Sequence, residues 1–142
     1  GTGRFLDVMS RVLEVPLDQM GKVHFQAKEW AQVSSTCTVF AESEVISQLS
    51  KGLPRESIVA GVHQSVAVKA CGLAFRGGIT PDVVIGVKND VVMCGGVAQN
   101  AGVVDAIEKE LQQSITVAPH PQITGALGAA LMAYEELKKQ NK

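Results

Sequence analysis

The sequence lacks any run of basic residues. Its 13 lysines and arginines are balanced by 14 aspartates and glutamates, giving a formal net charge of −1, and aromatic residues make up only 4% of the 142 positions. A protein that follows a phosphodiester backbone needs a basic stripe, commonly with aromatic side chains beside it. Nucleic acid is therefore excluded as an expected partner. The apolar content of 46% with 19% charge is typical of one globular domain with a single core.

Cysteine is scarce and is not arranged in pairs. No CxxC pattern is present, and no signal peptide, transit peptide or long apolar segment is visible. These absences predict a chain without a membrane partner, located in the reducing cytoplasm. The three cysteines are Cys37, Cys71 and Cys94.

Common nucleotide and catalytic motifs are also missing. No segment fits the Walker A pattern or GxGxxG, and no Ser-His-Asp or Cys-His arrangement is indicated. The histidines share no ligand spacing with each other or with a cysteine. We therefore expect His24, His63 and His120 to be surface or packing residues.

Apolar periodicity predicts an α/β chain that is rich in helix and has a small sheet. Helical spacing predicts helices over residues 3–14, 39–50, 100–111 and 125–139, a longest helix from Pro54 to the Gly77-Gly78 pair, and a short turn over 17–25. Gly52 has the place of the residue just past a helix end. Strands are predicted over 32–36, 83–87, 91–94 and 115–118. Small residues at 125–130 predict a helix surface that permits close helix approach.

Cys37 lies just before the predicted helix over 39–50, in the stretch SSTCTVFAESEV. Backbone N–H groups and the positive end of the helix dipole favour a thiolate at such a position, and a thiolate can ligate a metal or attack a substrate. The alternative is a small buried hydrophobe, the usual role of an isolated cysteine. Hydroxyls at Ser34, Ser35, Thr36 and Thr38 favour the first interpretation. Cys71 and Cys94 are expected to be core residues.

Two glycine-rich segments have features of ligand sites. Gly95-Gly96 follows a predicted strand, and Asn100 precedes a predicted helix, so this backbone can approach a flat or anionic ligand. A purely structural turn is the alternative. The opening segment Gly1, Thr2 and Gly3 heads the first helix and is either part of a phosphate-facing loop or a frayed terminus.

These segments resemble, in order along the chain, the motifs of one family. GTGRFLDVMSRVLEV resembles the tail of its CAAGTGRF segment, SSTCTVFAESEVISQLSKG its second cysteine motif, GGVAQN its adenosine motif, and GALGAALMAYEELKK its final helix. The family comprises the ATP-dependent activators of 2-hydroxyacyl-CoA dehydratases and the ATPase subunits of benzoyl-CoA reductase, the BadF/BadG/BcrA/BcrD type.

The resemblance implies a ribonuclease-H-like domain of the actin-like ATPase superfamily. It also implies a homodimer with one [4Fe–4S] cluster at the two-fold axis, two cysteines from each subunit, and ATP hydrolysis with Mg that drives a low-potential electron to an acyl-CoA dehydratase or aryl-CoA reductase. In this pattern Cys37 is the second cluster ligand. The nucleotide-binding positions are Gly1, Thr2, Gly3, Gly95, Gly96 and Asn100.

The resemblance covers only the C-terminal part of such an ATPase. The first cluster cysteine and the main phosphate-binding segments would precede Gly1, so we expect residues 1–142 to be a single, truncated C-terminal domain without a complete cofactor site. We expect it to be inactive alone, to bind ADP weakly and to self-associate through an uncovered edge. The alternatives are a sugar or acyl kinase-like domain of the same superfamily, and a non-catalytic oligomerisation domain.

Overall fold

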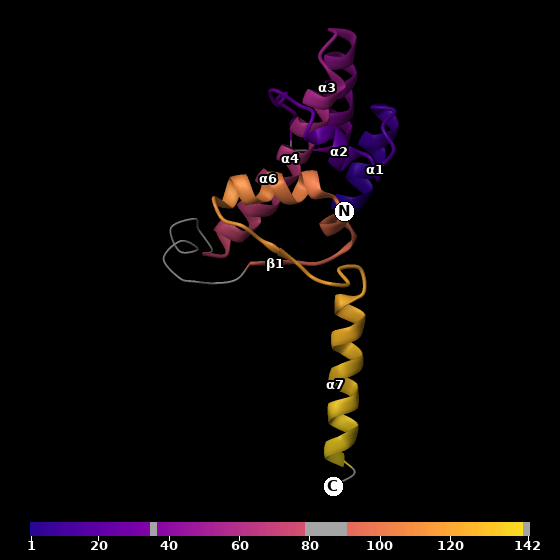
Figure 1. Cartoon of the computed structure of the whole chain (residues 1–142), viewed down its shortest axis with the longest axis vertical. Coiled ribbons are helices and arrows are strands. Elements are labelled where there is room, and N and C mark those ends of the chain that lie inside the picture. The colour runs from indigo at the N-terminus through magenta and orange to yellow at the C-terminus, as the bar shows by residue number, and fades with distance from the viewer. Residues whose placement is uncertain (35–36, 79–90, 141–142) are drawn as a thin grey trace.

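The chain folds into a helical body from which one long helix extends (Figure 1). The computed structural model describes residues 1–34, 37–78 and 91–140. Its elements are α1 (Thr2–Val12), α2 (Met20–His24), α3 (Thr38–Ser50), α4 (Arg55–Arg76), β1 (Val92–Met93), the 3-10 helix η1 (Gly96–Gln99), α6 (Ala101–Leu111), β2 (Thr116–Val117) and α7 (Thr124–Gln140). A helix-rich chain with a small sheet was predicted, and this architecture is confirmed.

The long helix α4 is the centre of the body. It packs mainly against α6 and α2, and it also contacts α1 and α3. Gly52, with φ +79°, follows the end of α3, and Gly78, with φ +85°, follows the end of α4, so both predicted glycine stops are confirmed. The core contains Leu6, Met9, Leu13, Val15, Met20, Ala31, Ala41, Val45, Ile58, Val59, Val62, Val66 and Val103.

The sheet consists, within the described ranges, of two short parallel strands. Val92 pairs with Thr116 and Met93 with Val117, so the predicted strands over 91–94 and 115–118 are confirmed with shorter bounds. The strand predicted over 32–36 is wrong for residues 32–34, which have no strand partner. That segment is held instead by a helix side chain, because Gln48 Nε2 donates to the Gln32 carbonyl at 2.5 Å. The strand predicted over 83–87 lies outside the described residues.

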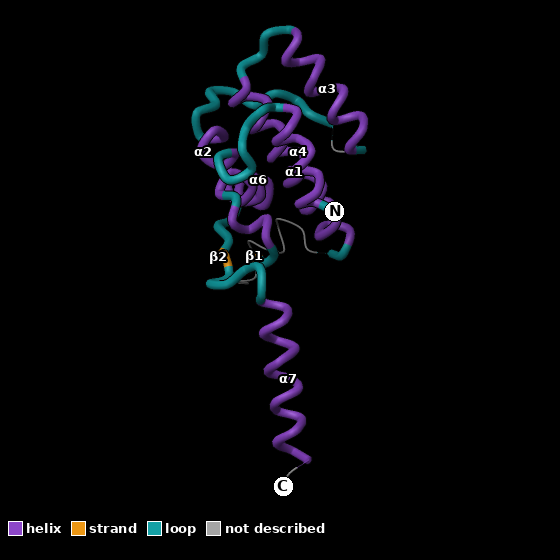
Figure 2. The backbone as a smooth tube through the Cα atoms, turned by 90° about the vertical axis from the view of Figure 1, so that its right-hand side faces the viewer, coloured by secondary structure: helices purple, strands orange, loops and turns teal. Residues whose placement is uncertain are grey.

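Helix α7 projects away from the helical body, as the two perpendicular views show (Figures 1 and 2). None of its residues is buried. The close helix approach predicted for its small-residue surface is therefore not made within residues 1–34, 37–78 and 91–140. The helix exposes large apolar side chains at Leu127, Leu131, Met132, Tyr134 and Leu137.

Helix α4 is long and apolar enough, by length and composition, to cross a membrane, although the sequence was expected to contain no such segment. Its middle is instead covered by α2 and α6, and His63 and Ser65 are buried there. Buried polar side chains with partners inside the protein are typical of a core helix. We therefore assign α4 to the core.

Gly61 on α4 should be intolerant of any side chain. A Cβ at this position would collide with the backbone carbonyl oxygen of Ala31. We predict that Gly61→Ala lowers the free energy of unfolding by about 1–3 kcal/mol, because the backbone must shift to relieve the overlap. Urea denaturation followed by circular dichroism measures this change.

Gly72 provides the matched control on the same helix. A Cβ there meets nothing within 4 Å. Gly72→Ala should leave stability unchanged or raise it by up to about 1 kcal/mol through helix propensity. Equal destabilisation by the two substitutions would contradict the packing described for Gly61.

Candidate functional site

A cavity of about 820 Å³ lies beside the carboxyl ends of the two parallel strands. This position is typical of ligand sites in α/β proteins, and the volume is in the usual range for small-molecule pockets. The wall comes from α1, the segment around α2, the loop after β1 and the loop after β2. It consists of Gly3, Leu6, Leu17, Asp18, Gly21, Lys22, Phe25, Gly96, Val97, Gln99, Asn100, Ala101 and Gln122.

The loop after β1 is shaped by one glycine and one capping residue. Gly95 has φ +90°, which only glycine adopts without strain, and its N–H donates to the Pro121 carbonyl at 2.6 Å. Asn100 then begins α6 as its N-cap. Its Oδ1 accepts from the N–H groups of Gly102 at 3.0 Å and Val103 at 3.3 Å. The loop after β1 is thus tied to the loop after β2, and both reach the cavity.

The structure brings together half of the predicted nucleotide-binding residues. Gly3, Gly96 and Asn100 line the cavity, although Gly3 is far in sequence from the other two. Gly95 lies in the adjoining turn and is not part of the wall. Two further predicted positions, Gly1 and Thr2, are the N-cap and the first residue of α1 and are also outside the wall.

The residues around α2 form the opposite wall of the cavity, and no motif in the sequence predicted them. Leu17 and Phe25 present exposed apolar surface, at 44% and 59% exposure, and Asp18 and Lys22 add one charge of each sign. Gln122 contributes an amide from the loop after β2. No local spacing marks these side chains, because only the packing of α2 against α6 brings them to the cavity.

Cys37 is the N-cap of α3 and is exposed, as the metal-ligand interpretation requires. Cys71 is buried as predicted, and burial, followed by the charge of Glu110, raises the pKa of its thiol to about 11. The prediction that Cys94 is a core residue is wrong, because it follows the end of β1 and faces solvent.

Among the described residues, no three or more His, Cys, Asp or Glu side chains gather as a metal site. One chain therefore offers a single exposed thiol at α3.

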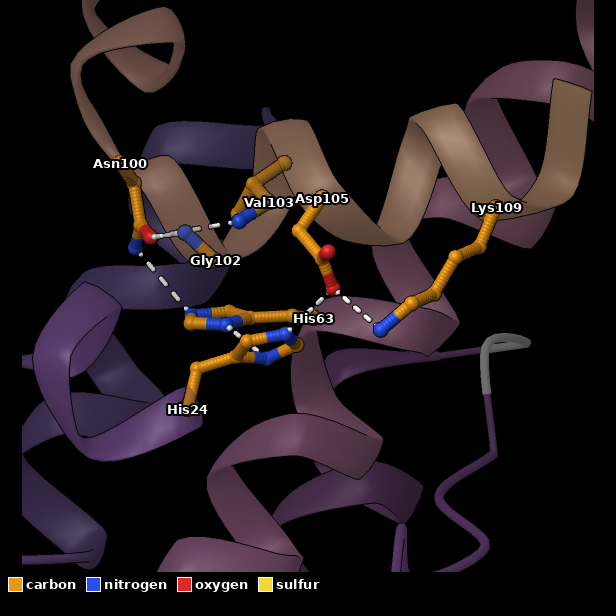
Figure 3. A network of polar contacts seen from close by, with 7 residues as sticks. All are labelled: His24, His63, Asn100, Gly102, Val103, Asp105 and Lys109. Carbon is orange, nitrogen blue, oxygen red and sulfur yellow. Dashed lines mark hydrogen bonds and ion pairs between the residues drawn. The ribbon is translucent and has the colours of Figure 1, made fainter. Parts of the chain in front are cut away.

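Two histidines form a buried network of polar contacts (Figure 3), which includes Asn100 of the cavity wall. His24 and His63 are buried, at 2% and 0% exposure, as the packing alternative predicted, and both also make side-chain hydrogen bonds. Asn100 Nδ2 contacts His63 Nε2 at 3.1 Å, and His63 Nδ1 contacts His24 Nδ1 at 3.1 Å. His24 Nε2 contacts Asp105 Oδ2 at 2.9 Å. The third histidine, His120, is exposed.

Burial keeps both of these histidines neutral at ordinary pH. Desolvation, with a smaller contribution from His24, lowers the pKa of His63 to about 3. Burial also lowers the pKa of His24, against the opposing effect of its hydrogen bond to Asp105. Burial alone would raise the pKa of Asp105, but hydrogen bonds from Lys109 and His24 outweigh it and lower that pKa.

These pKa directions predict a loss of stability on acidification. An unfolded histidine binds a proton near pH 6.5, whereas His63 in the folded chain stays neutral down to about pH 3. The unfolded state is therefore favoured as the pH falls below 6.5, with a contribution from His63 of up to about 1.4 kcal/mol per pH unit. Urea denaturation at several pH values between 7 and 5 measures the slope.

The control for this slope is the exposed histidine. His63→Gln should give a shallower dependence of the free energy of unfolding on pH, while His120→Gln should keep the slope of the unsubstituted chain. Identical slopes for all three proteins would contradict a neutral, buried His63.

Nearly the whole chain matches known proteins. The profile of the BadF/BadG/BcrA/BcrD ATPase family matches residues 1–133. The activator of lactoyl-CoA dehydratase from Anaerotignum propionicum is 60% identical over 140 residues, which cover 99% of this chain and 51% of the relative. The (R)-2-hydroxyglutaryl-CoA dehydratase activating ATPase of Acidaminococcus fermentans is 51% identical over 98% of this chain and 50% of its own length.

The fold agrees with that of a solved activator. The structure of the activator of the 2-hydroxyisocaproyl-CoA dehydratase from Clostridium difficile, with bound ADPNP, superposes with a TM-score of 0.84 and 48% identity. The superposition covers 98% of this chain and 49% of that one. The chain thus spans about half the length of the curated relatives it matches. By its sequence motifs and its fold, the chain belongs to the BadF/BadG/BcrA/BcrD ATPase family.

Proposed function

We propose that this chain is the C-terminal domain of an ATP-dependent activator that delivers a low-potential electron to a 2-hydroxyacyl-CoA dehydratase or a benzoyl-CoA reductase. The observation that carries the proposal is the match, over 98% of the chain, to an activator that holds ADPNP. One of the subunits of benzoyl-CoA reductase from Thauera aromatica is a more distant relative, at 32% identity. The whole protein would be a cytoplasmic homodimer that docks on its dehydratase or reductase.

We assign the nucleotide to the cavity at the strand ends. Gly3 and Gly96 leave room for a ligand to approach the backbone, because a Cβ there would only touch Val97 Cγ2 at 3.8 Å and Gln122 Nε2 at 3.6 Å. Phe25 and Leu17 offer apolar surface for a base, while Lys22, Asn100 and Gln122 supply polar groups at the rim. These residues would bind and orient the adenosine part, and the bound ATP would supply the driving hydrolysis.

The residues present fit only part of an iron–sulfur site. A [4Fe–4S] cluster is held by thiolates, normally four of them, and Cys37 is an exposed thiol at a helix start. A second copy of the chain would add a second thiol, and the remaining two would come from the residues that precede the segment matching Gly1 in the full-length protein. The role of Cys37 would be to hold one iron of the cluster at the dimer interface.

Phe25 is the residue through which we test the nucleotide site. The isolated chain should bind ADP with a dissociation constant of about 0.1–1 mM, since it has few phosphate contacts. Phe25→Ala should weaken binding about tenfold, because stacking of a base on an aromatic ring contributes about 1–3 kcal/mol. A titration followed by NMR chemical shifts measures both constants.

Phe40 on α3 is the matched control, because it is similarly exposed, at 69%, and lies outside the cavity wall. Phe40→Ala should leave the dissociation constant unchanged. A chain that binds ATP tightly and only with magnesium, or one whose affinity is insensitive to Phe25→Ala, would contradict the assignment.

Cys37 is tested in a protein extended at its N-terminus to the length of its relatives. After anaerobic reconstitution with iron and sulfide, Cys37→Ala should abolish the charge-transfer absorption of the cluster, because one thiolate is lost from each subunit. Cys94→Ala is the control, since Cys94 is also exposed but follows a strand. A full cluster signal in Cys37→Ala would remove this residue from the ligand set.

A further inference from the structure

A series of polar contacts crosses the junction of α2, α4 and α6 (Figure 3). It ends at Asn100, which is part of the cavity wall. It runs from Asn100 through His63 and His24 to Asp105, with every link between 2.9 and 3.1 Å. Nothing in the sequence motifs accounts for these two buried histidines. Their arrangement suggests a role beyond filling space.

The direction of the first hydrogen bond is set by the backbone. The N–H groups of Gly102 and Val103 can only donate, so the Asn100 atom that they contact must be the acceptor, Oδ1. Asn100 Nδ2 therefore points to His63 and donates to its Nε2. If the amide were flipped, its NH₂ group would face two backbone donors, and both capping hydrogen bonds to Asn100 would be lost.

The tautomers of both histidines follow from this direction. His63 is neutral and accepts at Nε2, so its proton is on Nδ1 and is donated to His24 Nδ1. His24 then carries its proton on Nε2 and donates to Asp105 Oδ2. Asp105 is held in turn by Lys109, whose Nζ lies 2.7 Å from the same oxygen. This single arrangement of protons satisfies every hydrogen bond from Asn100 to Asp105.

The junction leaves these groups no space to rearrange. A Cβ added at Gly102 would approach His63 Nδ1 to 2.5 Å and His24 Cβ to 2.7 Å. A Cβ at Gly21 would approach Asn100 Oδ1 to 3.3 Å. Helix α6 therefore lies directly on the two imidazole rings. The amide of Asn100 is confined from the side of α2 as well.

We propose that His63, oriented by His24 and Asp105, is a positioning residue that fixes the side-chain amide of Asn100 and thereby the N-terminus of α6 at the wall of the ligand cavity. The identity of the ligand rests on the proposed function, whereas the positioning itself does not. His63 touches no part of the cavity, since it is absent from the wall, and it acts through Asn100.

Two substitutions separate positioning from packing. His63→Leu fills the site but removes the acceptor for Asn100 Nδ2, whereas His63→Gln retains an acceptor while losing the ring. Val59→Ala on the same helix serves as the stability control, because Val59 is fully buried in the core and has no contact in the polar chain.

The first experiment uses the ligand-free chain. Nitrogen NMR of the imidazoles should show a proton on Nδ1 of His63 and on Nε2 of His24. Hydrogen exchange of the Gly102 and Val103 amides should accelerate about fivefold to tenfold in His63→Leu relative to core amides, as expected when a helix cap is weakened. His63→Gln should restore most of the protection of these two amides. Val59→Ala should change the exchange rates of all amides by a similar factor. The opposite tautomers, or unchanged exchange in His63→Leu, would overturn the proposal.

The second experiment adds ADP. His63→Leu should weaken ADP binding about tenfold, the effect of losing one well-placed hydrogen bond. His63→Gln should recover most of that affinity, and Val59→Ala should bind as the unsubstituted chain does. If ADP binds equally to all four proteins, the positioning role is overturned while the nucleotide site stands. If ADP binds to none of them, the proposed function fails, and the tautomers and exchange rates still decide on the positioning role.

Discussion

The structure depends on the close approach of α6 to α2 and α4 at Gly102. With any side chain at this position, the N-terminus of α6 would have to move off the imidazoles of His24 and His63. That movement would take Asn100 away from His63 and open the cavity wall that Asn100 and Ala101 form. The absence of one Cβ therefore sets the position of the helix, and the helix sets the position of the site. Gly61, against the Ala31 carbonyl, has the same function on the other side of α4.

The contacts that join Asn100, His63, His24 and Asp105 stabilise the junction of α2, α4 and α6 mainly because each buried polar group has a hydrogen-bond partner. Each unsatisfied buried polar group costs about 1–3 kcal/mol, so removing one member of the chain also penalises its neighbours. Charged imidazoles would incur a desolvation cost at this depth, and the lowered pKa of each ring keeps them neutral. The charges are placed at the outer end, where Asp105 meets Lys109 and the Lys109 ammonium lies 4.3 Å from the centre of the Trp30 ring. Burial favours this arrangement, in which the imidazoles inside the protein are neutral and the charged Asp105–Lys109 pair lies nearer the surface.

Local patterns predicted the helices well and the site only in part. The apolar spacing of α1, α3, α4 and α6 and the glycines that follow α3 and α4 are properties of adjacent residues, so these helices could be predicted from the sequence. The failed strand at 32–34 depends on Gln48, and the exposure of Cys94 depends on how the loop after β1 is tied to Pro121. The contact of His24 with Asp105 spans 81 residues, and that of His63 with Asn100 spans 37. No spacing rule detects such pairs, because the packing of three helices creates them.

The cavity and Cys37 are separate places that share one element. Helix α1 contributes Gly3 and Leu6 to the cavity wall and contacts η1, and it also packs against α3, whose N-cap is Cys37. Leu6 and Met9 of α1 belong to the same core cluster as Ala41 and Val45 of α3, so the two helices meet through buried apolar side chains. Interiors at this packing density have low compressibility and transmit displacement rather than absorb it. Helix α1 therefore touches both the ligand cavity and the helix that begins at the exposed thiol.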